Sequence, residues 1–97
     1  MTARRVQTRR WDPVEYLDTP AAMAEYLEAA LAEGDAAVVA AALGDIARAQ
    51  GMTEVARRAG LGRESLYKAL SAKGNPELAT VLRVVRALGL GLHASSR

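Results

Sequence analysis

Residues 52–71, MTEVARRAGLGRESLYKALS, decide the predicted fold. A helix-turn-helix joins two helices at a steep angle through a very short turn. The first helix needs a small residue where the second crosses it, which Ala56 supplies, and the turn needs a residue that tolerates positive φ, which Gly60 supplies. Apolar side chains fall at the positions that lock the angle, namely Val55, Ala59, Leu61, Leu66, Ala69 and Leu70. The spacing predicts a helix-turn-helix, and the alternative is a generic pair of core helices joined by a glycine turn.

The outward face of the second helix separates DNA binding from mere packing. We expect its N-terminal end to enter the major groove, whose base edges carry a readable pattern of donors and acceptors. Arg63 could contact guanine with two hydrogen bonds, and Glu64 could accept one from cytosine or pair with Lys68 instead. The predicted DNA-binding residues are Thr53, Arg57, Arg63, Glu64, Tyr67, Lys68, Ser71 and Lys73. Thr53, Arg57 and Lys73 suit phosphate contacts, and for each single residue a solvated surface position is the alternative.

Helix signals extend the prediction in both directions from this segment. Thr19 and Pro20 begin a helix that runs to Gly34, and Asp35 caps a second one that ends at Gly51. Gly44 inside the second helix suggests the close approach of another backbone. The helix-turn-helix supplies the next two helices, from the cap Thr53 to Gly60 and from residue 63 to about residue 71. Asn75 and Pro76 open a fifth helix, which stops at Gly89.

The predicted fold is all-α, a five-helix lambda-repressor-like domain over residues 19–97. Residues 1–18 are expected to form a flexible arm, and the chain after Gly89 a short tail or strand. Apolar residues at helical spacing predict the buried stripes. Met23, Tyr26, Leu27, Ala30 and Leu31 form the stripe of the first helix, and Leu78, Val81, Leu82, Val85 and Leu88 form that of the last.

Composition excludes several classes of function. The 97 residues suffice for one domain, and they contain no cysteine and a single histidine, His93, so neither a disulfide framework nor a histidine metal cluster is expected. No apolar stretch is long enough to span a bilayer, and we expect a cytoplasmic protein without membrane, metal or cofactor. The sequence shows no paired carboxylates, nucleophile elbow or phosphate-cradling glycine loop, so an enzyme is not expected.

The net charge of +2 hides a strong segregation along the chain. Residues 1–10 carry four arginines and no acid, residues 11–52 have a net charge of −7, and residues 53–97 have a net charge of +5. Such polarity suggests two different partners, or one partner approached from one side. Ordinary surface charge that happens to be segregated is the alternative.

Four segments together resemble the addiction-module antidote proteins, the HigA-like antitoxins of bacterial type II toxin–antitoxin pairs. They are ALGDIARAQGM (42–52), GLGRESLYKAL (60–70), GNPELATVL (74–82) and RALGL (86–90). The resemblance covers about four-fifths of the chain. It implies an Xre-type domain that binds a palindromic operator as a homodimer and neutralises a small toxin of the RelE/ParE superfamily. Gly62 departs from the pattern, which usually has serine as helix cap there; glycine caps less well by only a few tenths of a kcal/mol.

The resemblance suggests a role for the acidic residues within 11–52. A toxin that acts on RNA is expected to be basic, and acidic side chains could cover its charged surface. Glu33 and Asp35 could help to cover such a surface, and the predicted partner-binding residues are Trp11, Tyr16, Glu25 and Glu28. A solvated acidic helix face is the alternative, as is docking of Trp11 on its own domain. Val84, which lies off the predicted core stripe, is assigned to the dimer contact together with Leu90 and Leu92.

Two further readings stay open at this point. One is a stand-alone helix-turn-helix regulator without a toxin partner. The other is a helical interaction adaptor whose helix-turn-helix does not bind DNA. A short basic reading frame beside the gene would favour the antitoxin, and a steep salt dependence of DNA binding would exclude the adaptor.

Overall fold

A computed structural model describes residues 12–71 and 73–96, and this part of the chain is all-helical. A 3-10 helix, η2 (Pro13–Tyr16), precedes α2 (Pro20–Glu33), α3 (Ala36–Gln50), α4 (Met52–Ala59), α5 (Arg63–Ala69) and α6 (Leu78–Ala87). The prediction of five α-helices is confirmed. No strand occurs in the described residues, so the strand considered for the C-terminal tail is absent there.

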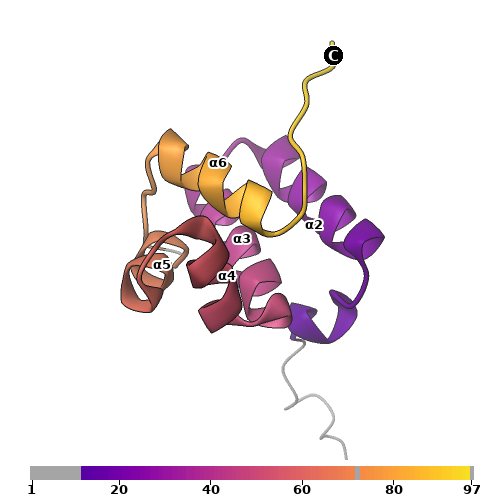
Figure 1. Cartoon of the computed structure of the whole chain (residues 1–97). Helices are drawn as coiled ribbons and strands as arrows, with labels where there is room; N and C mark the ends of the chain where they lie inside the picture. Colours follow the sequence, from indigo (N-terminus) through magenta and orange to yellow (C-terminus); the bar gives the residue numbers. More distant parts are fainter. Residues whose placement is uncertain (1–11, 72, 97) are drawn as a thin grey trace, which may run out of the picture.

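Helix α3 occupies the middle of the molecule, with α2 on one side and α5 on the other, and α6 crosses in front (Figure 1). α2 and α4 both pack on α3, and α6 packs on α4. The core gathers around Leu43 and Ile46 of α3, whose side chains are fully buried. No helix among the described residues has the length and apolar character needed to cross a membrane.

Two predicted caps form as expected. The hydroxyl of Thr19 accepts a hydrogen bond from the backbone N–H of Ala22 (3.1 Å), and the carboxylate of Asp35 accepts one from that of Ala37 (2.9 Å). These bonds satisfy backbone donors that have no partner inside the first turn of a helix. The starts of α2 and α3 are therefore set by local sequence.

Two other predicted helix starts are wrong. α4 begins at Met52 with Gly51 as its cap, so Thr53 lies inside the helix rather than capping it. α6 begins at Leu78, after Glu77, and not at Pro76. The connection before α6 passes close over the end of α5: a Cβ on Gly74 would lie 2.5 Å from the carbonyl oxygens of both Lys68 and Ala69. Residues 74–77 are thus used to cross α5 before the next helix can start.

The folded body begins earlier than predicted. Residues 12–18 were expected to belong to a flexible arm, but Asp12 caps η2 by accepting a hydrogen bond from Val14 N–H (3.1 Å), and Leu17 is buried. η2 packs on α3, which explains the burial of Leu17. The remainder of the expected arm lies outside the described residues.

The buried stripe of α6 differs from its prediction. Val84, Val85, Ala87 and Leu88 are buried, whereas Leu78 and Leu82 are 70% and 49% exposed. Leu31 of α2 is also more exposed than expected, at 44%. The C-terminal half of α6 lies against α4 and the core, and its first turns extend beyond them. An amphipathic pattern predicts that a helix forms. It does not predict which turns of that helix a neighbouring helix will bury.

Candidate functional site

The turn between α4 and α5 has the geometry that the sequence predicts. Gly60 has φ +71°, which L side chains rarely adopt. Its N–H donates to Arg57 O (3.2 Å), and the N–H of Leu61 donates to Ala56 O (2.9 Å). This pair of bonds is the Schellman arrangement that closes a helix end and satisfies its last carbonyl groups. α4 therefore stops sharply, and α5 can start after two more residues.

The two helices are held together by the apolar residues that the spacing selected. Val55 and Leu66 are fully buried, and Ala56 is 3% exposed at the crossing. α4 also packs on α6, so the pair is attached to the core. The N-terminus of α5 carries no side-chain cap, because Gly62 occupies that position. α5 depends on its packing for its position.

The polar face of α5 is exposed to solvent, as predicted. All eight predicted DNA-binding residues are exposed, and six of them lie at or near α5: Arg63, Glu64, Tyr67, Lys68, Ser71 and Lys73. The guanidinium of Arg63 lies 5.8 Å from the centroid of the Tyr67 ring, a cation–π distance. No ion pair joins Glu64 to Lys68 among the described residues, so the pairing considered as an alternative use of Glu64 does not form there.

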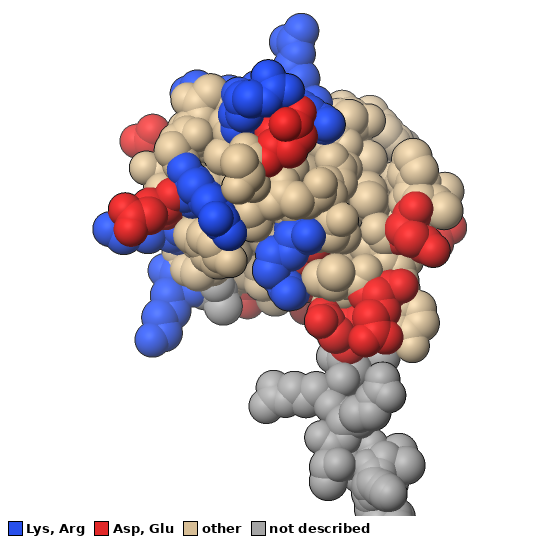
Figure 2. Space-filling model, turned by 60° about the horizontal axis from the view of Figure 1, so that its bottom comes forward, with Lys and Arg blue, Asp and Glu red and all other residues tan. Residues whose placement is uncertain are grey.

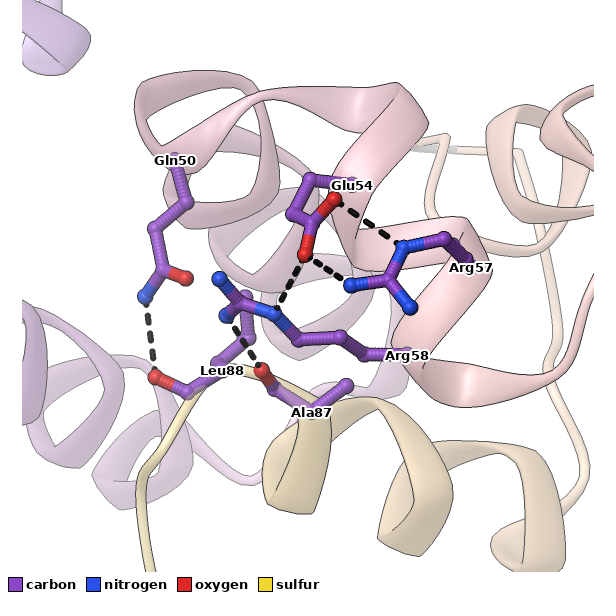
Figure 3. Close-up of polar contacts among 6 residues, drawn as sticks. All are labelled: Gln50, Glu54, Arg57, Arg58, Ala87 and Leu88. Carbon is purple, nitrogen blue, oxygen red and sulfur yellow. Dashed lines mark hydrogen bonds and ion pairs between the residues drawn. The ribbon is translucent and has the colours of Figure 1, made fainter.

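Thr53 and Arg57, the other two predicted DNA-binding residues, are exposed on α4. Arg57 forms an ion pair with Glu54, and Arg58 donates to the same carboxylate at 3.1 Å (Figure 3). Hydrogen bonds from Arg57 and then Arg58 lower the pKa of Glu54 to about 2. Glu54 thus stays ionised and holds Arg57, the predicted phosphate contact, in an internal pair.

Two arginines that the sequence analysis missed fasten α4 to α6. Arg83 of α6 donates to Ala59 O and to Gly60 O, each at 3.0 Å, at the end of α4. In the opposite direction Arg58 of α4 donates to Ala87 O (3.2 Å) at the end of α6, as Figure 3 shows. Each arginine caps the carboxyl end of the other helix. No local pattern marks these positions, because the bonds span 24 and 29 residues.

A second polar cluster lies between η2, α2 and α3. Asp45 accepts hydrogen bonds from Tyr26 Oη (2.7 Å) and from Arg48 (2.8 Å), and Arg48 also lies 3.8 Å from a carboxylate oxygen of Asp12. Burial, followed by the hydrogen bond to Asp45, raises the pKa of Tyr26 to about 12. The cluster ties the start of the folded body to α3.

Charge is segregated in space as it is along the chain. Lys and Arg spread over the side that holds α4 and α5, whereas Asp and Glu gather near the point where the chain enters η2 (Figure 2). Tyr16, Glu25 and Glu28, three predicted partner-binding residues, are exposed on η2 and α2. Trp11, the fourth, lies outside the described residues.

The predicted dimer contact needs a correction. Val84 is fully buried in the core of its own chain, so it cannot meet a second copy. Leu90 is half-buried and packs against the same core, and only Leu92, at 42% exposed, remains available. The described residues contain no group of three or more side chains suited to holding a metal ion.

These observations define a class: a small all-helical protein in which a short helix pair presents a polar face on the basic side of the molecule. The chain belongs to the family described as "Probable addiction module antidote protein", whose model matches residues 7–96. An uncharacterized protein of Haemophilus influenzae is 46% identical over 84 residues, which are 87% of each chain. No solved structure matches the chain. Membership of an antidote family implies an antitoxin role and a cognate toxin partner.

Proposed function

We propose that this protein is the antitoxin of a type II toxin–antitoxin pair, which represses its own operon and neutralises a RelE/ParE-like toxin in the cytoplasm. It acts by binding, not by catalysis. α4 and α5 serve as the helix-turn-helix of a lambda-repressor-like domain, and a homodimer places two copies of α5 on a palindromic operator. Symmetric dimers compensate for the few base pairs that one such motif reads.

One observation carries the DNA-binding part of the proposal: α5 is fixed by buried Leu66, and its whole outer face is polar and exposed. The guanidinium of Arg63 lies over the ring of Tyr67 on the solvent side of this helix, so a basic and an aromatic group are presented together. Arg63 and Glu64 stand in the first turn, the part of a recognition helix that reaches base edges. We assign these two to base readout.

The remaining positions suit the phosphate backbone. Lys68, Ser71 and Lys73 lie along and just after α5, and Thr53 and Arg57 lie on α4. Arg57 must loosen its pair with Glu54 to reach a phosphate, and such an exposed pair costs little to open. Phosphate contacts fix the register of the protein on DNA without reading sequence.

The test is binding to the promoter fragment of the protein's own gene at two salt concentrations. Each phosphate contact contributes a slope of about −0.9 in log affinity against log salt. Arg63→Ala is expected to lose about 1–3 kcal/mol on the operator and little on random DNA. Arg86→Ala, on the exposed side of α6, is the matched control and should bind both like the wild type. Equal losses of the Arg63 variant on both DNAs would contradict base readout.

The toxin part of the proposal rests on the family and on the exposed acidic side chains of η2 and α2. Co-expression with the short reading frame beside the gene is expected to yield a stable complex and to relieve toxicity of that partner. A neighbouring product that neither binds nor inhibits growth would favour the stand-alone regulator. Light scattering decides the homodimer, for which Leu92 is the remaining exposed member of the predicted contact.

A further inference from the structure

The first turns of α6 carry an apolar stripe that the rest of the described chain leaves largely uncovered. Leu78 is 70% exposed and Leu82 is 49% exposed, more than any other leucine among the described residues. Residues four apart lie on the same face of a helix, so the two side chains adjoin, and the exposed Ala79 lies beside them. Single exposed leucines are ordinary on a protein surface, whereas adjoining ones often mark an interaction site.

Opposite charges stand at the two ends of this stripe. Glu77 precedes α6 as its N-cap, and Arg86 lies in the last turn of α6, one turn beyond Leu82. Both charged side chains are exposed, and neither belongs to an ion pair within residues 12–71 and 73–96. Along its exposed side α6 therefore runs from an acidic end, through two leucines, to a basic end.

This order of groups is complementary to itself when a second copy of the helix lies antiparallel. Glu77 and Arg86 are five and four residues from Leu82. A two-fold axis beside Leu82 brings the two copies of this leucine together and places Glu77 of one copy near Arg86 of the other. A parallel copy would set like charges against each other, and a basic toxin would be repelled by Arg86. An antiparallel second copy is thus the occupant that the charges favour.

The stripe lies beside the carboxyl end of α5, so a contact there leaves the DNA-reading end free. A Cβ on Gly74 would clash with the carbonyl oxygens of Lys68 and Ala69, because the connection into α6 crosses the end of α5. In Figure 1 the orange start of α6 stands at the edge of the molecule, above α5. Arg63 and Glu64, assigned to base readout, are in the first turn of α5, at its other end.

We propose that Leu78 and Leu82 form the homodimer contact, in which α6 of a second copy lies antiparallel across a two-fold axis. The inference rests on the proposed function, because it assigns the surface of the homodimer that reads the operator. It takes the place of the contact predicted at Val84, which is buried. Exposed ion pairs contribute little to affinity, so the leucines carry the contact and a change at Arg86 leaves it nearly intact.

Self-association of the full chain is measured first, by sedimentation velocity over a range of concentrations, without DNA or toxin. The wild type is expected to pass from one chain to two as the concentration rises. Leu82→Lys removes a leucine from each copy and brings two ammonium groups together at the axis, so it should weaken self-association by roughly 100-fold. Leu31→Lys, at an exposed leucine of α2, is the matched control and should associate like the wild type.

Cysteine substitutions test the antiparallel arrangement, because the chain contains no cysteine of its own. Leu82→Cys is expected to form a disulfide-linked dimer on oxidation, since the two copies of residue 82 meet at the axis. Glu77→Cys should not, because its two copies stand at opposite ends of the contact. Efficient linkage through position 77 but not through position 82 would overturn the antiparallel contact.

The remaining outcomes separate this inference from the proposed function. If the wild type and Leu82→Lys dimerised equally well, the contact would lie elsewhere, and the inference would fail while the homodimer stood. A Leu82→Lys variant that dimerised but no longer bound the toxin would assign the stripe to the toxin instead. A wild type that stayed monomeric at every concentration and on operator DNA would remove both the contact and the homodimer. Unchanged helicity by circular dichroism shows that each variant keeps the fold.

Discussion

Gly44, inside α3, has no room for a side chain. An added Cβ would lie 2.6 Å from the backbone oxygen of Leu70, because the end of α5 crosses α3 at this point. Gly44→Ala improves helix propensity by about 1 kcal/mol, but a clash with backbone costs about 1–3 kcal/mol or more. We expect a net loss of stability, measured as a lower midpoint of urea unfolding.

Gly62→Ser is the matched comparison at the same scale. A Cβ on Gly62 meets only the Ser65 hydroxyl, at 3.9 Å, and serine supplies the side-chain cap that α5 lacks. This variant should gain a few tenths of a kcal/mol. If both substitutions stabilised the protein, the close crossing of α3 and α5 would be wrong.

Glu54 gives a pH dependence with a definite sign. Its pKa is lowered from 4.5 to about 2 by hydrogen bonds from Arg57 and Arg58, so the folded state favours the carboxylate. The stabilisation is present above pH 4.5 and is lost as the pH falls towards 2. Glu54→Gln should therefore lower the melting temperature at pH 7 and converge with the wild type near pH 2. A constant difference across this range would show that the ion pairs are not responsible.

Single residues also show which parts of the structure local sequence can predict. Gly60 and Gly44 were predicted correctly, because a left-handed turn and a close backbone contact both exclude side chains whatever the rest of the fold does. Arg83 was not predicted, because its two carbonyl partners lie 24 and 23 residues away and come within reach only after α6 has packed on α4. The sequence does not distinguish an arginine that caps a distant helix from one that is only solvated.

At the scale of elements, α6 shows a different limit. Its sequence predicts an amphipathic helix, and the helix forms, but the covered sector is shifted towards Val84 and away from Leu78 and Leu82. Which residues of α6 are buried depends on where α4 crosses it. The periodicity of the sequence carries no information about that crossing. A charge at Val84 would unfold the domain rather than separate a dimer, since a buried unpaired charge is costly.

The joint between α4 and α6 can be tested through Arg83. Arg83→Met keeps the aliphatic stem and removes both hydrogen bonds to the end of α4, at an expected cost of about 1 kcal/mol. For a domain of this size that corresponds to a melting temperature lower by roughly 4–8 °C. Arg86→Met, an exposed position on the same helix, should change it little. If both variants lowered the melting temperature equally, the loss of a positive charge would be the cause, and not the loss of the hydrogen bonds from Arg83 to the end of α4.

The whole molecule separates two charged sides, and this separation makes its two proposed partners independent. Thr19 caps the start of α2 and Gly34 closes its end, so Glu25 and Glu28 stand on the acidic side, away from α5 (Figure 1). Charges at the rim of an interface act mainly on the association rate. Replacing both glutamates by lysine should slow association with a basic toxin and weaken the complex, most strongly at low salt.

The same double variant should still find the operator, and its affinity for DNA in general should rise slightly because the two substitutions raise the net charge by four units. Arg63→Ala should do the reverse, losing operator preference while binding toxin as the wild type does. Surface plasmon resonance with each partner in turn measures both effects. If the lysine variant lost operator binding, or the Arg63 variant lost the toxin, the two surfaces would overlap. The charge segregation would then serve one partner approached from a single side.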